Sequence, residues 1–154
     1  MQDYIISIVG CQQLEGEENE IQLTTVGSYI NKDGNRYIIY SEYEEDNPSS
    51  KITSVLKVEG DKKVTLIRNS SDRTRLVLEK GKRHQCFYNT GFGNMMVGVF
   101  TKDIESTLTD EGGQLEVNYS LDINSGLTSL NQIFFDIKKG TGRKNVTNSN
   151  RCNN

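Results

Sequence analysis

Apolar and polar residues alternate strictly between positions 114 and 123. The apolar positions are Leu115, Val117, Tyr119, Leu121 and Ile123. A period of two is typical of a β-strand that has one face buried and the other in water. The segment therefore predicts a half-buried strand.

The next apolar run, over residues 127–137, fits a second strand that pairs with the first. The residues between them, Asn124-Ser125-Gly126, suit a three-residue hairpin loop with glycine in the left-handed conformation. Such a loop puts Leu127 opposite Ile123, so that both apolar sets fall on one face. The same register puts Asn131 opposite Tyr119 and Ser129 opposite Leu121.

A similar hairpin is predicted around Gly60-Asp61-Lys62. A three-residue loop there pairs Val58 with Val64, and it places Arg68 opposite Ser54 on the inward face. A two-residue loop would put the apolar sets on opposite faces, so we favour the longer loop.

Asp33-Gly34 marks a third hairpin, between strands near 20–31 and 36–43. In the first of these strands the apolar residues change parity after Leu23. A bulge at Gly27 would restore the alternation, because one extra residue reverses the faces.

The remaining segments complete an all-β fold. Further strands are predicted at about 3–11, 73–79, 83–90 and 94–102, with one helical turn within 103–113 and a loop at 44–50.

The chain has no alanine, the best helix former. Eight to ten strands joined by tight hairpins predict a closed antiparallel up-and-down β-barrel. We assign it to residues 1–139 and expect a disordered polar and basic tail over 140–154.

Charge is distributed unevenly along the chain. Residues 1–50 carry ten acidic side chains against two basic ones, whereas residues 62–83 carry eight basic side chains against two acidic ones. A basic hairpin at 62–83, together with the tail, is able to attract an acidic protein or RNA. The alternative is a solvated surface whose opposite charges are neighbours in the fold.

Several motifs in the second half of the chain resemble one bacterial family. They are Glu79-Lys-Gly-Lys-Arg-His84, Tyr88-Asn-Thr-Gly-Phe-Gly93, Gly98-Val-Phe-Thr-Lys102 and the stretch from Glu111 to Asn124. These motifs identify the chain as similar to the YwiB-like family of unknown function. That resemblance implies a lipocalin-like (calycin) β-barrel and a cytoplasmic bacterial protein, and it implies no catalytic residues.

The residues themselves predict neither catalysis nor a cofactor. The chain has no nucleotide-binding loop, no zinc-type cysteine spacing and no nucleophile elbow. His84 is the only histidine, and Cys86 two positions later shares its strand face. A metal at this pair would need ligands that we do not find, so we expect no enzyme, no metal and no cofactor.

Polar residues that share parity with the core are the candidate ligand-binding groups. Arg68, Tyr119, Ser129 and Asn131 point into the barrel on the registers above, and His84 and Tyr88 join them if the preceding loop has three residues. With a two-residue loop His84 faces outward, and the sequence leaves this open. These groups either bond to one another in a filled barrel or face a cavity and orient a ligand.

The sequence therefore supports two functional hypotheses. The first is a non-enzymatic barrel that binds a small, partly polar ligand. The second is a solid barrel that docks on an acidic protein or RNA through the 62–83 hairpin and the tail. No apolar run is long enough for a membrane span, and three cysteines leave one unpaired, so we expect a cytoplasmic protein.

Overall fold

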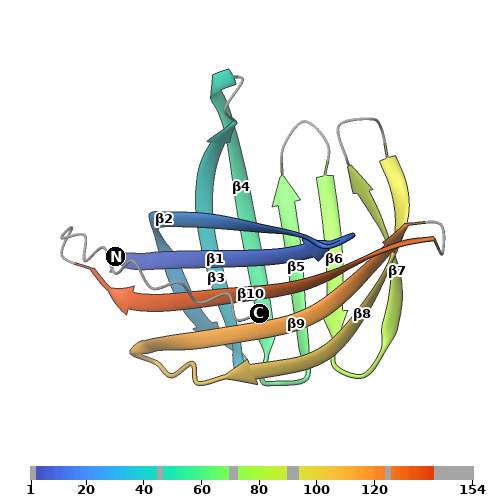
Figure 1. The fold of residues 1–154 in the computed structure, drawn as a ribbon. Coiled ribbons are helices and arrows are strands. Elements are labelled where there is room, and N and C mark those ends of the chain that lie inside the picture. Colours follow the sequence, from blue (N-terminus) through green and yellow to red (C-terminus); the bar gives the residue numbers. More distant parts are fainter. Residues whose placement is uncertain (1–2, 45–46, 70–72, 90–93, 124–125, 141–154) are drawn as a thin grey trace.

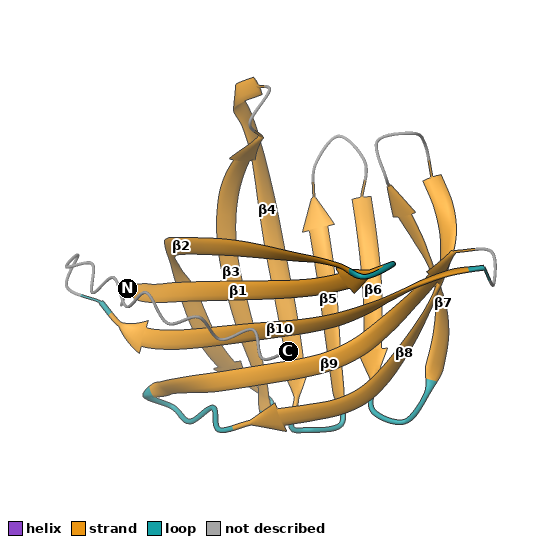
Figure 2. Cartoon of the chain, viewed as in Figure 1, coloured by secondary structure: helices purple, strands orange, loops and turns teal. Residues whose placement is uncertain are grey.

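The described part of the chain is built entirely from strands, turns and loops. A computed structural model describes residues 3–44, 47–69, 73–89, 94–123 and 126–140, and for a few strand residues next to the gaps it describes the backbone alone. Figure 2 shows strands and connecting loops, and no helix, over these residues. Accordingly, they include no helix that is long and apolar enough to cross a membrane.

Ten strands follow one another along the chain. They are β1 (Tyr4–Leu14), β2 (Glu17–Lys32), β3 (Asn35–Glu44), β4 (Asn47–Glu59), β5 (Lys63–Asn69), β6 (Arg73–Glu79), β7 (Arg83–Asn89), β8 (Asn94–Ser106), β9 (Gly112–Ile123) and β10 (Leu127–Lys139). All of the paired strands are antiparallel, and their order is β6-β5-β4-β3-β2-β1-β10-β9-β8-β7. The predicted antiparallel meander is confirmed, and it forms a nearly closed barrel (Figure 1).

The barrel consists of two sheets that cross each other (Figure 1). The front sheet contains the first half of β2 with β1, β10, β9, β8 and β7, and the back sheet contains the second half of β2 with β3 to β6. Strand β2 belongs to both because residues 17–27 pair with β1 and residues 28–32 pair with β3. The chain thus passes between the sheets at Gly27.

Gly27 is a corner and not the predicted bulge. A Cβ atom there would lie 2.2 Å from the carbonyl oxygen of Ile39 and 2.6 Å from Ile6 Cδ1. The alternation continues through the corner, with buried Tyr29 on the inner face and Val26 and Ile30 exposed outside. The prediction of a bulge was wrong because it assumed that Val26 and Ile30 are buried, whereas both are exposed.

The hairpin registers predicted from loop length are confirmed. Leu127 pairs with Ile123, and Val58 pairs with Val64. The Asp33-Gly34 turn has positive φ at both residues, 54° and 81°, which is the geometry of a type I′ hairpin.

The two ends of the strand order, β6 and β7, meet at a seam. The turn between them is closed by a hydrogen bond from Lys82 N to Glu79 O at 3.0 Å. Gly81 N then donates to Thr101 O of β8 at 2.7 Å, and Lys80 forms a bridge with the same residue. The barrel is therefore closed at this seam through the turn rather than through a continuous ladder.

The apolar core runs along the barrel, from the loop that joins β8 to β9 as far as Val97 and Val99 near the start of β8. Its fully buried side chains include Ile6, Ile38, Leu56, Ile104, Leu115, Val117 and Phe135. The β2–β3 hairpin holds the loop in place: Tyr29 Oη donates to Thr109 O at 2.6 Å, and Arg36 pairs with Asp110. Burial raises the pKa of the Tyr29 phenol more than the Arg36 charge lowers it.

Two predicted irregular segments belong to strands. Residues 103–106, expected in a helical turn, continue β8 after a register shift between Thr101 and Asp103. Residues 47–50, expected in a loop, begin β4. The predicted tail beyond Gly140 lies outside the described residues.

Candidate functional site

A row of polar side chains crosses the inner face of the front sheet. Cross-strand pairing joins Asn19 to Gln12, Gln12 to Asn131, Asn131 to Tyr119 and Tyr119 to Thr101. We call these five residues the front row. Because cross-strand partners share a face, the row extends across five strands on the core-facing side.

The back sheet carries a matching row. Tyr40 pairs with Ser54, Ser54 with Arg68, and Arg68 with Thr74. We call these four residues the back row, of which Tyr40, Ser54 and Thr74 are buried. Apolar core residues border both rows on either side: Val99 and Ile104 flank Thr101 on the inner face of β8, and Ile52 and Leu56 flank Ser54 on that of β4.

Two hydroxyls in these rows have no hydrogen-bond partner among the described residues. Ser54 Oγ and Thr101 Oγ1 belong to side chains with no exposed surface, and among the described residues neither oxygen is within hydrogen-bond geometry of another group. Burial raises the pKa of the Tyr40 phenol and a hydrogen-bonding interaction with Ser54 offsets part of that rise, so Ser54 Oγ is less completely unpaired than Thr101 Oγ1. An unpaired buried hydroxyl costs about 1–3 kcal/mol, so each needs an explanation.

Arg68 lies where the hairpin register predicts it, opposite Ser54. Its Nη2 donates to Glu42 Oε1 at 2.8 Å, and the side chains of Arg68 and Glu42 are 34% and 29% exposed. The carboxylate that neutralises Arg68 thus comes from β3, two strands away. The pair keeps this part of the interior electrically neutral and within reach of solvent.

Asn131 and Ser129 bond to each other on β10. Asn131 Nδ2 donates to Ser129 Oγ at 3.0 Å and to Ser129 O at 3.3 Å, and both side chains are buried. Tyr119 is half-buried against the core. The interior positions predicted for all three residues are correct.

His84 is on the inner face, which settles the alternative that the sequence left open. It shares its face with buried Cys86 and pairs with Val99 of β8. Its Nε2 lies 2.8 Å from Glu79 Oε1, so the histidine bridges the seam between β6 and β7 and does not belong to either polar row. Tyr88 pairs with Met95, and its side chain lies outside the described part.

The basic 62–83 segment is partly neutralised by neighbouring acids. Among the described residues, four basic side chains of this segment form ion pairs: Arg68 with Glu42, Lys80 with Asp103, Lys82 with Glu79 and Arg83 with Asp122. This arrangement favours the solvated-surface interpretation of the charge pattern.

Of the cysteines in the described residues, Cys86 is a buried free thiol and Cys11 is disulfide-bonded. The prediction of a cytoplasmic protein partly rested on the absence of a disulfide framework. That support is weakened, and the compartment stays a prediction.

Several members of the polar rows were missed by the sequence analysis. Thr101 was missed because the register of β8 shifts beside it, and Gln12 because its strand was predicted to end one residue earlier. Thr74 and Tyr40 share parity with buried neighbours, so extending the predicted hairpin registers would have found them.

These features define a class: an all-strand, nearly closed barrel whose apolar interior is crossed by two rows of polar side chains. The family model described as "Domain of unknown function (DUF1934)" matches residues 6–134, and the chain belongs to this family. The resemblance noted in the sequence is thereby confirmed.

Two comparisons give relatives of the chain. It is 24% identical over 128 residues to the uncharacterized β-barrel protein YwiB of Bacillus subtilis (strain 168), covering 82% of this chain and 87% of that protein. The crystal structure of the ywiB protein from Bacillus subtilis matches with a TM-score of 0.78 at 22% identity, covering 91% of this chain and 93% of that one. This likeness supports the fold.

Proposed function

We propose that the protein is a non-enzymatic binder of a small, uncharged polar molecule, held between the front row and the back row. The observation that carries the proposal is the pair of buried hydroxyls, Ser54 Oγ and Thr101 Oγ1, without hydrogen-bond partners in the described structure. A ligand that hydrogen-bonds to these groups would remove the cost of burying them.

The charge of the rows narrows the class of ligand. Arg68 is the charged member of the two rows, and Glu42 already neutralises it. A strongly anionic ligand would have to displace this carboxylate, whereas an uncharged ligand adds hydrogen bonds without breaking the pair. Tyr40 and Tyr119 add aromatic surface, so we expect a molecule with both hydrogen-bond donors and a flat or apolar part.

Native mass spectrometry tests the proposal. We expect protein purified from its natural host under non-denaturing conditions to carry a bound small molecule. Thr101→Val should lose that molecule, because the substitution removes the hydroxyl and keeps the shape. Thr128→Val, which changes an exposed threonine of β10, is the matched control and should retain it.

Two results would contradict the proposal. One is wild-type protein that carries no small molecule and is not stabilised by any compound in a library of uncharged metabolites. The other is a bound molecule that Thr101→Val, Ser54→Ala and Thr128→Val retain equally.

A further inference from the structure

Cys11 lies on the outer face of the front sheet and is disulfide-bonded. It precedes Gln12 of the front row, and because side chains alternate along a strand, its side chain is directed away from the interior. The chain contains two other cysteines, and one of them, Cys86, is a buried free thiol. Within a single chain, the partner left for Cys11 is Cys152, in the C-terminal segment 141–154 that lies outside the described residues.

The described end of the chain lies against the same face. Gly140 N donates to Asp3 O at 3.1 Å, next to the last pair of the β1–β10 ladder. A Cβ atom on Gly140 would lie only 2.6 Å from Ile5 Cγ1. Ile5 is an even number of residues from Cys11 on β1, so the two side chains share the outer face. The chain therefore leaves β10 on the outer side of the front sheet.

The C-terminal segment is long enough to reach Cys11 along this face. Ile5 and Cys11 are six residues apart on β1, which is roughly 20 Å at the rise of a strand. The twelve residues from Gly140 to Cys152 extend to about 40 Å. A path along β1 passes the outward apolar residues Val9 and Phe134, which are cross-strand partners.

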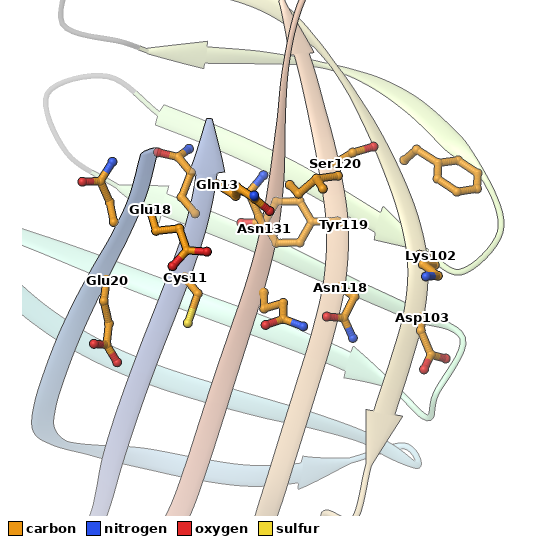
Figure 3. Close-up of a pocket in the computed structure, with 15 residues that line it drawn as sticks. Cys11, Gln13, Glu18, Glu20, Lys102, Asp103, Asn118, Tyr119, Ser120 and Asn131 are labelled. Atoms are coloured by element: carbon orange, nitrogen blue, oxygen red, sulfur yellow. The ribbon is translucent and has the colours of Figure 1, made fainter. Parts of the chain in front are cut away.

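Charge also favours contact between the segment and this face. Residues 141–154 carry three basic side chains and no acidic one. Cys11 pairs across the strands with Glu20, and both Glu20 and Glu18 are exposed carboxylates on β2, beside Cys11 in Figure 3. Arg151 directly precedes Cys152, so a disulfide to Cys11 brings a guanidinium within reach of Glu20.

We propose that the C-terminal segment 141–154 docks on the outer face of the front sheet, that a disulfide between Cys11 and Cys152 holds it there, and that reduction releases it. The segment covers Val9 and Phe134, on the opposite side of the sheet from the proposed interior site. Its basic side chains lie near the carboxylates of β2.

Release occurs by thiol–disulfide exchange with a dithiol reductant. One thiolate of the reductant attacks a sulfur of the Cys11–Cys152 bond and forms a mixed disulfide, and its second thiol then displaces the protein sulfur. The reductant becomes a disulfide, and its two protons and two electrons leave Cys11 and Cys152 as thiols. The state of the segment therefore follows the redox poise of its surroundings.

Peptide mapping without reduction tests the disulfide. Full-length protein is equilibrated with oxidised glutathione, denatured, blocked with iodoacetamide and digested with trypsin, which cleaves after Lys and Arg. We expect residues 1–32 linked to residues 152–154, with Cys86 alkylated, and we expect dithiothreitol to abolish the link. Alkylation of both Cys11 and Cys152, glutathione on each of them, or disulfide-linked dimers would overturn the proposal.

Hydroxyl-radical footprinting tests whether the linked segment covers the face. Labelling of Val9 and Phe134 should rise when the oxidised protein is reduced with dithiothreitol and desalted. Tyr43 of β3, which is 63% exposed, is the internal control and should not change. Cys152→Ser should give the reduced level of labelling under both conditions. Equal labelling of Phe134 in the oxidised and reduced wild type would refute docking.

A glutathione redox titration measures the contribution of charge. Glu20→Gln should lower the equilibrium constant for disulfide formation roughly two- to fivefold, because it removes the carboxylate opposite Cys11. The difference should fade at high salt. Glu17→Gln, a matched change at an exposed residue of β2 with the opposite parity, is the control and should titrate like the wild type. Equal constants for both variants and the wild type would overturn docking of the basic segment beside β2.

Discussion

Individual buried hydroxyls give the sharpest prediction at the scale of single residues. In ligand-free protein, Thr101→Val and Ser54→Ala should each raise the free energy of unfolding by about 1 kcal/mol, because each removes a buried group that lacks a partner. Urea denaturation measures the effect. Thr128→Val, at an exposed position, should change the free energy of unfolding little. A loss of stability in both buried variants would show that the two hydroxyls have hydrogen-bond partners.

The ion pair between Arg68 and Glu42 gives a second prediction at this scale. Arg68→Met should lower the free energy of unfolding by about 1–2 kcal/mol, because it leaves the Glu42 carboxylate without its partner. The cost is moderate since solvent reaches both side chains. A double-mutant cycle with Glu42→Leu should recover much of the loss, and no recovery would mean that the two residues act independently.

Strand β2 turns the corner between the sheets, and Gly27 makes that turn possible. Gly27→Ala should lower the free energy of unfolding by about 1–3 kcal/mol, because its Cβ would meet the backbone of Ile39 and the side chain of Ile6. Thermal denaturation of Gly10→Ala is the control, since nothing lies within 4 Å of a Cβ at that β1 position. Equal melting temperatures for the two variants would contradict the close contact.

The stability of the seam between β6 and β7 depends on pH through the ionisation of Glu79. The hydrogen bond from His84, assisted by Lys82, lowers the pKa of Glu79 from its ordinary value of 4.5 despite some desolvation. A carboxyl group whose pKa is lowered by folding stabilises the fold at pH values above its ordinary pKa. That contribution is lost as the pH falls through the pKa of the folded state.

Glu79→Gln should therefore be less stable than wild type near neutral pH, and the difference should disappear on acidification below 4.5. Melting temperatures measured across the acid range check this. Glu17→Gln, at an exposed residue, should follow the wild type throughout. A Glu79→Gln deficit that stays constant with pH would rule out the linkage.

The charge distribution of the whole molecule predicts weak nucleic-acid binding. Because four basic residues of the 62–83 segment are already paired with acids, the positive surface is smaller than the sequence suggests. Fluorescence anisotropy with a single-stranded RNA should show weak binding at low salt and none that saturates at physiological ionic strength. Tight binding that survives high salt would revive the RNA-binding hypothesis.

Features that involve only neighbouring strands could be predicted from local residues. The length of a hairpin loop and the alternation on either side together define a register, so the Asn131–Tyr119 and Arg68–Ser54 pairs could be derived from local residues. The same reasoning correctly placed Ser129 inside the barrel.

Contacts between distant segments became known from the folded barrel. Gln12 joins Asn131 because the first and last strands pair, and Arg68 finds Glu42 across an intervening strand. The corner at Gly27 and the register shift beside Thr101 likewise depend on how two sheets close on each other. Local alternation and hairpin registers build the back row, but only the pairing of the first and last strands completes the front row and places the two rows in one interior.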